Sequence, residues 1–159
     1  ADGVLDNAVR NLIADGVTVA IAAGNGGFLG NPEDACLASP ARVAEAITVG
    51  ASDINDARAS FSNTGPCIDL FGPGVGITSA WLGGGTNTIS GTSMATPHVA
   101  GVAAQFLETH RRATPARVRT ALFDKSTKDI ITGDGAGCFL IILFCWPATP
   151  NNHLIHTDF

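Results

Sequence analysis

The 159-residue chain contains no tyrosine and a single methionine, whereas 19 of its residues are glycine. Glycine permits tight turns and the close approach of two backbone segments, so this composition favours functional sites built on loops. The length is that of one ordinary domain, and 45% of the residues are hydrophobic. A core can therefore form without help from metals or disulfides, and a globular domain is expected.

The sequence lacks an apolar run long enough to cross a bilayer. The run at residues 138–146, CFLIILFCW, has nine residues, about half of the ~20 that a membrane helix needs, and it indicates either a buried strand or an anomalous segment. The first residues, ADGVLDNAVRNL, lack the basic stretch and apolar centre of a signal peptide. We expect no membrane association and no signal peptide within this chain.

The chain also lacks a basic stripe, because its nine lysines and arginines are scattered and its net charge is −5. The sequence therefore argues against nucleic acid as a partner. The four cysteines, at positions 36, 67, 138 and 145, show no C-x-x-C spacing. The absence of this spacing argues against a zinc ribbon and against a thioredoxin-type redox site.

Helix-like and strand-like patterns alternate along the chain. Apolar side chains at intervals of three and four residues predict helices, and short β-branched runs predict buried strands. Helices alternating with such strands are typical of an α/β fold with a mostly parallel sheet flanked by helices. The expected elements are a helix capped by Asp2 and ended by Gly16, strands at residues 17–23, 46–51 and 68–72, a hairpin tip at 82–88, a helix from Thr92, and a helix capped by Thr114 that runs through Leu122.

The segment SGTSMATPHVAG, residues 90–101, places Ser93 at the start of a predicted helix. Free N–H groups and the positive end of the helix dipole favour negative charge at this position. A serine becomes a nucleophile only when a base takes its proton and donors stabilise the oxyanion. The segment is not the G-x-S-x-G elbow of α/β-hydrolases, because Ala95 stands where the second glycine belongs. From these residues alone, a helix N-cap is the favoured interpretation of Ser93.

The same segment, GTSMATPHVAG, resembles the nucleophile segment of subtilisin-like serine proteases. VAIAAGN, SPARVAEAITVGASD and ARASFSNTGPCIDLFGPG resemble further segments of that family, in the branch of proteinase K and aqualysin. The resemblance runs from about residue 4 to residue 137. It implies a subtilisin-like α/β fold and a serine endopeptidase that acts on protein or peptide substrates. A preference for apolar or aromatic substrate side chains is expected at the level of the family only.

The resemblance implies that Ser93 is the acylated nucleophile and that Asn25 donates to the oxyanion, with the Ser93 N–H as second donor. A neutral amide suits this role because it donates a hydrogen bond and cannot take up the transferred proton. A turn role after a strand is the alternative for Asn25. His98 is not expected to be the base, because five residues along a helix turn its side chain about 140° from Ser93.

The resemblance further implies that Ala22, Ala23 and Gly24 form one wall of the pocket for the substrate side chain. The histidine of an H-G-T-H-like segment and the aspartate of a D-T/S-G-like segment, which supply base and carboxylate in the family, are absent from this chain. We therefore expect residues 1–137 to be the C-terminal part of the catalytic domain, incomplete at its N-terminal side and inactive alone. A pseudo-protease or a truncated fragment remains the alternative.

Residues 138–159 form a tail in which the resemblance fails. Two interpretations stay open. The tail is either a divergent final strand or the product of an altered reading frame next to an aggregation-prone apolar run.

Cys36 and Cys67 match positions that form a disulfide in the aqualysin-type branch, and two buried free thiols are the alternative. A disulfide would imply a secreted protein in an oxidising setting. The resemblance also implies a structural calcium bound by the Asp69 carboxylate and the carbonyls of Ala44 and Ala46, although Asp69 also suits a turn or surface position. No cofactor is expected for catalysis, and the full-length protein is expected to be a monomer.

A nucleotide-binding α/β module is the rival interpretation from another functional class. GNGGFLG, residues 24–30, approaches the G-x-G-x-x-G fingerprint. Leu29 stands where the third glycine is required, and NPEDACLASP does not continue as the helix that this motif needs. The fingerprint is therefore not fulfilled.

Overall fold

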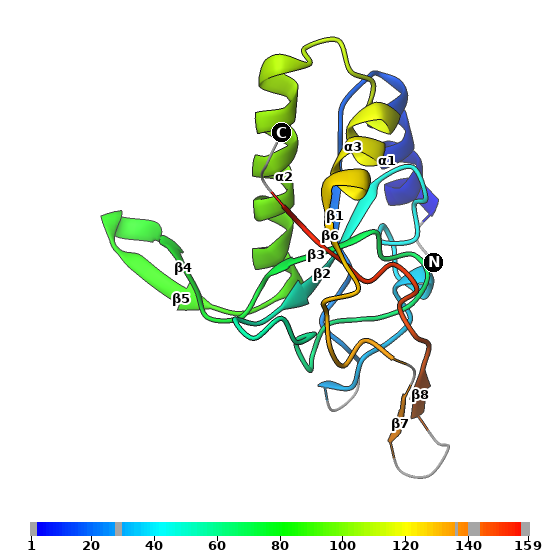
Figure 1. Ribbon diagram of the computed structural model, residues 1–159, viewed down its shortest axis with the longest axis vertical. Coiled ribbons are helices and arrows are strands. Elements are labelled where there is room, and N and C mark those ends of the chain that lie inside the picture. Colours follow the sequence, from blue (N-terminus) through cyan, green and yellow to red (C-terminus); the bar gives the residue numbers. More distant parts are fainter. Residues whose placement is uncertain (1–2, 28–29, 136, 140–143, 157–159) are drawn as a thin grey trace.

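The computed structural model describes residues 3–27, 30–135, 137–139 and 144–156 (Figure 1). Its architecture is α/β, as the sequence predicts. The helices are α1 (Gly3–Ala14), α2 (Thr92–Thr109) and α3 (Pro115–Lys125), with the short 3-10 helices η2 (Ala35–Leu37) and η3 (Leu82–Gly84). The strands are β1 (Ala20–Ala22), β2 (Ile47–Ser52), β3 (Leu70–Pro73), β4 (Ile77–Ala80), β5 (Thr86–Ile89), β6 (Thr127–Lys128), β7 (Gly137–Phe139), β8 (Phe144–Trp146) and β9 (His153–Leu154).

A sheet in the order β1-β2-β3-β9-β6 forms the centre of the molecule. Strands β1, β2, β3 and β9 run parallel to one another, and β6 runs antiparallel to β9. Strand β1 is shorter than the predicted run of residues 17–23. The reason is that its partner β2 begins at Ile47, which pairs with Ala20, so earlier residues have no strand beside them.

Successive side chains of the sheet point to opposite faces, and each face has its own core. Ile47, Val49 and Ala51 of β2 pack under α2 and α3. On the other face, Phe71 of β3 packs in one cluster with Val9 of α1. Every residue of β2 is buried, as expected for a strand covered on both faces.

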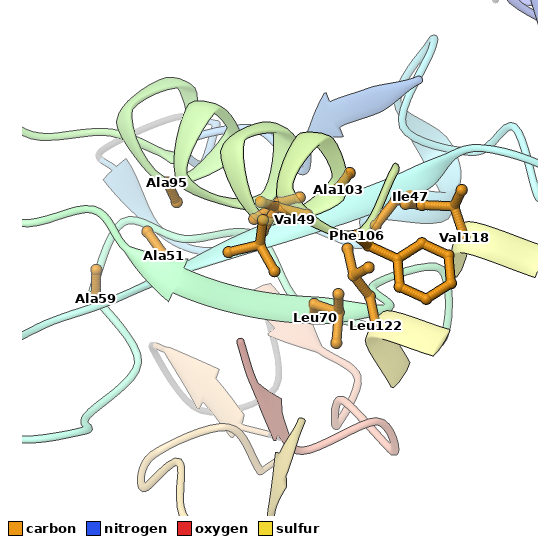
Figure 2. Close-up of a cluster of buried hydrophobic side chains, with 12 residues drawn as sticks. Ile47, Val49, Ala51, Ala59, Leu70, Ala95, Ala103, Phe106, Val118 and Leu122 are labelled. Atoms are coloured by element: carbon orange, nitrogen blue, oxygen red, sulfur yellow. The ribbon is translucent and has the colours of Figure 1, made fainter. Parts of the chain in front are cut away.

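Helix α2 buries one face because its apolar residues recur at helical spacing. Figure 2 shows Ala95, Ala103 and Phe106 of this helix facing the side chains of the sheet. The ring of Phe106 lies near Val118 and Leu122 of α3, so the two helices share this core. The capping prediction for α3 is met, since the Thr114 hydroxyl accepts the Arg117 N–H at 3.3 Å.

The apolar run 138–146 does not form one buried strand. Strand β7 pairs with β8 as an antiparallel hairpin, and residues 140–143 lie outside the described residues. Further along the tail, β9 lies between β3 and β6, and Asn151 Nδ2 donates to the Ile68 carbonyl at 2.9 Å. The end of the tail is thus part of the central sheet. Among the described residues, no helix combines the length and apolarity that a bilayer crossing requires.

Candidate active site

Ser93 is exposed at the second residue of α2, at the end of the helix into which β5 leads (Figure 1). The Gly91 carbonyl accepts hydrogen bonds from the N–H groups of Met94 at 2.9 Å and Ala95 at 3.3 Å, which begin the helix. The Ser93 N–H lies in the first turn and makes no hydrogen bond in the described part of the chain. Its hydroxyl and N–H are both available at the positive end of the helix dipole.

Asn25 follows β1 and is hydrogen-bonded directly to the start of α2. Its Oδ1 accepts the Thr92 N–H at 2.8 Å and the Thr92 hydroxyl, also at 2.8 Å. These two bonds hold the Oδ1 atom of the amide in place. The Nδ2 group lies beside Gly91, since a Cβ atom added to Gly91 would lie 3.3 Å from it. Nδ2 donates to no acceptor within the described residues. The structure thus brings Asn25 to the residue before Ser93 and leaves its donor free.

Asn63 holds the loop that carries Asn25. Its Oδ1 accepts the N–H groups of Gly26 at 2.9 Å and Glu33 at 3.0 Å, and its Nδ2 donates to the Ala23 carbonyl at 2.9 Å. The side chain is buried, so these bonds have little competition from water. A Cβ on Gly24, where φ is +102°, would come 2.5 Å from Asn63 Nδ2, so a glycine is required there.

The sequence did not identify Thr92 or Asn63 as site residues. Thr92 lies 67 residues from its partner Asn25, and Asn63 lies 37 residues from Gly26. No local pattern connects positions so far apart. Both residues lie in segments that carry the family resemblance, which was the one signal that could have pointed to them.

The three residues of the predicted pocket wall differ in their exposure to solvent. Ala23 is fully buried, and its N–H donates to the Val49 carbonyl. Ala22 and Gly24 are partly exposed beside it, and the Gly24 N–H donates to the Thr92 hydroxyl at 3.2 Å. Ala22 and Gly24 are therefore accessible to solvent, whereas the side chain of Ala23 is not. The pocket assignment itself stays a prediction.

His98 lies apart from Ser93, in agreement with the helical-wheel argument. Its Nδ1 is 2.9 Å from the Met94 carbonyl of its own helix. The ring lines a hollow of about 400 Å³ between α2 and the β4–β5 hairpin, with Trp81, Met94 and Pro97 among the other lining residues. In the described part of the chain, no histidine hydrogen-bonds to Ser93.

Asp69, the candidate calcium ligand, is engaged by protein donors. Its Oδ2 accepts the Thr48 N–H at 2.9 Å, and its Oδ1 is paired with Arg119 of α3. Burial raises the pKa of Asp69, and the Thr48 and Arg119 contacts oppose that shift. Both oxygens accept hydrogen bonds from protein groups, so a calcium ion bound here would compete with the Arg119 guanidinium for the carboxylate. Calcium held here together with the Ala44 and Ala46 carbonyls remains an untested expectation.

Cys36 and Cys67 form a disulfide, with their Cα atoms 5.3 Å apart. The bond joins η2 to the loop before β3, and the Asp34 side chain accepts the Cys36 N–H at 2.9 Å beside it. The alternative of two free thiols is therefore not what the structure shows.

Residues 2–138 match the model of the subtilase family, Peptidase S8. The chain belongs to the subtilase family. The match covers the segments that position both Ser93 and Asn25, and it excludes the nucleotide-binding interpretation for this region. In this fold, Asn25 after β1 contacts the first turn of α2, although the two segments are far apart in the sequence.

Two curated subtilase relatives and one solved structure illustrate the similarity. The extracellular serine proteinase of Thermus sp. (strain Rt41A) is 54% identical over 85% of this chain and 32% of its own length. Alkaline serine exoprotease A of Vibrio alginolyticus is 48% identical over 80% of this chain and 23% of its own length.

A cold-adapted subtilisin-like serine proteinase of known crystal structure superposes with a TM-score of 0.83 at 42% identity, over 97% of this chain and 50% of that one. The subtilisin-like fold predicted from the sequence is thereby confirmed. The chain spans about a quarter to a third of these two curated relatives and half of the solved chain.

Proposed function

We propose that the chain is the nucleophile-bearing part of a serine endopeptidase that hydrolyses peptide bonds. The observation that carries the proposal is the pair of hydrogen bonds from Thr92 to Asn25 Oδ1, which directs the amide donor to the turn that bears Ser93. A helix N-cap needs no such link from a second segment. A preorganised donor beside an exposed serine is what acyl transfer requires.

In this proposal the Ser93 hydroxyl loses its proton to a base and attacks the peptide carbonyl carbon. The negative charge that forms on the carbonyl oxygen accepts hydrogen bonds from Asn25 Nδ2 and the Ser93 N–H. Collapse of the tetrahedral intermediate breaks the C–N bond, and the base returns the proton to the leaving amine. Water then hydrolyses the acyl group and restores Ser93. Protein or peptide chains are the proposed substrates.

The base and its carboxylate partner are proposed to lie in another part of the catalytic domain. The described histidines make no hydrogen bond to Ser93, and the relatives are about two to four times as long as the part that this chain matches. The chain alone should therefore show no meaningful peptidase turnover. We also place the protein outside the cell, because the Thermus relative is named extracellular and the chain holds a disulfide.

A chimera tests this function directly. Residues 1–137 would replace the matching part of the Thermus relative, and hydrolysis of a chromogenic peptide would be measured with and without a serine-directed phosphonate. We expect turnover that the phosphonate blocks, complete loss in Ser93→Ala, and a kcat lower by about 10²–10³ in Asn25→Ala, as for the oxyanion asparagine of subtilisin, a family member.

The isolated 159-residue chain is the matched comparison, and it should be inactive. A folded chimera without turnover would contradict the proposal and favour a non-catalytic scaffold. Phosphonate-sensitive turnover by the isolated chain would contradict the claim that the base lies elsewhere.

A further inference from the structure

Positive charge is concentrated in residues 111–128, which run from the end of α2 through α3 to β6, and is not spread evenly along the chain. Residues 111–128 contain six of the nine basic residues and one acidic residue, a local charge of +5, so the rest of the chain carries −10. Arg111, Arg112 and Arg117 are exposed and line one open hollow of about 620 Å³. We call these three residues the arginine corner. Glu108 is the one acidic residue among those lining this hollow.

Favourable interactions with the dipoles of the two helices account for only part of this positive cluster. Arg111 and Arg112 follow the C-terminal end of α2, where positive charge is favourable. Arg117 instead lies in the first turn of α3, which contains no acidic residue. The positive end of the α3 dipole disfavours a basic residue there. In the described part of the chain, none of the three arginines forms an ion pair with a carboxylate. A bound anion would supply the missing negative charge.

We propose that the arginine corner binds a short acidic segment of a polypeptide. Arginine forks match carboxylates with two parallel hydrogen bonds, so closely spaced glutamates or aspartates fit the three guanidinium groups. A long polyanion would extend from the corner over the acidic remainder of the surface. A short acidic segment stays within the corner, where its charges lie inside the ~8 Å screening length of physiological salt.

The arginine corner and Ser93 lie at opposite ends of α2 (Figure 1). The 18 residues of the helix span roughly 27 Å. An extended peptide covers about 3.3 Å per residue, so about eight or more residues separate a bond at Ser93 from an acidic segment at the corner. The extension of this inference to substrates rests on the proposed function. Under that function, the arginine corner is a second contact for substrates with a distant acidic segment.

Binding of a fluorescein-labelled peptide with four consecutive glutamates tests the inference without catalysis. Fluorescence anisotropy would be measured on the full 159-residue chain at low and at physiological ionic strength. We expect saturable binding that weakens with salt, and at least tenfold weaker binding by Arg111→Gln/Arg117→Gln. The matched control, Arg10→Gln/Lys128→Gln, removes the same charge from other exposed positions and should stay within about twofold of the parent.

Equal weakening by both double variants would overturn the inference, because it would show general attraction to charge. Binding of a sulfated polysaccharide but not of the glutamate peptide would overturn it as well, as would no binding at all. Circular dichroism checks that each variant is folded. Fluorescence anisotropy needs no turnover. If the 159-residue chain binds the peptide while the chimera is inactive, the proposed function is refuted and this inference stands.

Discussion

The Thr92 side chain is the residue on which the geometry of the candidate site most directly depends. Its hydroxyl donates to Asn25 Oδ1 at 2.8 Å and accepts the Gly24 N–H at 3.2 Å, and the residue is fully buried. One small side chain therefore links the helix that bears Ser93 to the loop that bears Asn25, the proposed oxyanion donor. A buried hydroxyl with both of its roles used leaves little freedom for either segment.

Replacement of Thr92 by valine should lower kcat in the chimera about three- to tenfold with KM nearly unchanged. Valine keeps the shape of threonine but removes the hydroxyl. Asn25 Oδ1 then loses the hydrogen bond from the hydroxyl, a bond between neutral groups, and keeps the one from the backbone N–H. Thr92→Ser is the matched control, since it restores the hydroxyl and should recover most of kcat. Equal activity of the valine and serine variants would show that the hydroxyl does not position Asn25.

At the scale of elements, the disulfide ties two loops that flank the sheet. Cys36 lies in η2 and Cys67 lies just before β3, 31 residues apart in sequence. The same region is linked by hydrogen bonds from Ala35 N–H to the Thr64 carbonyl and from Thr64 N–H to the Glu33 carbonyl, both at 2.9 Å. The covalent bond therefore acts where the two segments already pair.

Loss of the disulfide should lower the free energy of unfolding by about 3–4 kcal/mol, because a loop of this length then gains freedom in the unfolded chain. Urea unfolding of the oxidised and the reduced protein measures this difference. The double variant Cys36→Ser/Cys67→Ser should match the reduced protein and be insensitive to reductant. A parent whose unfolding is unchanged by complete reduction would contradict the prediction.

At the scale of the whole molecule, α1 is held to the rest of the fold by few buried groups. Within the helix only Asp6 and Val9 are buried. Asp6 accepts hydrogen bonds from the Ser39 hydroxyl at 2.6 Å and from Arg42 Nε at 2.5 Å. The Ser39 hydrogen bond, followed by the Arg42 contact, lowers the pKa of Asp6 against the opposing effect of burial.

A carboxyl group whose pKa is lowered in the folded state stabilises the fold above its unfolded pKa, about 3.9, and loses this effect as pH falls through the lowered value. Asp6→Asn should therefore unfold at a lower urea concentration than the parent at neutral pH. The difference should shrink below about pH 4. The exposed Asp124→Asn is the control. A difference that is independent of pH would show that Asp6 does not act through its charge.

Local patterns predicted most of the elements. Thr114 followed by Pro115 gave the start of α3, and the apolar spacing gave α1 and α2. Strand limits were less accurate, since β1 begins only at Ala20, where its neighbour β2 begins to pair with it. Of the two interpretations of the apolar run 138–146, the single buried strand was wrong, because periodicity cannot distinguish a single strand from two that pair as a hairpin.

The sequence by itself determined the family, through segments such as the one that carries Ser93, and the order of helices and strands, because these depend on residues that are close together in the chain. Tertiary structure alone decided what surrounds each side chain. It placed Thr92 on Asn25 and filled the Asp69 oxygens with Thr48 and Arg119 contacts. Hydrogen bonds and charges act over a few ångströms in space, and only the fold sets which distant residues come within that range.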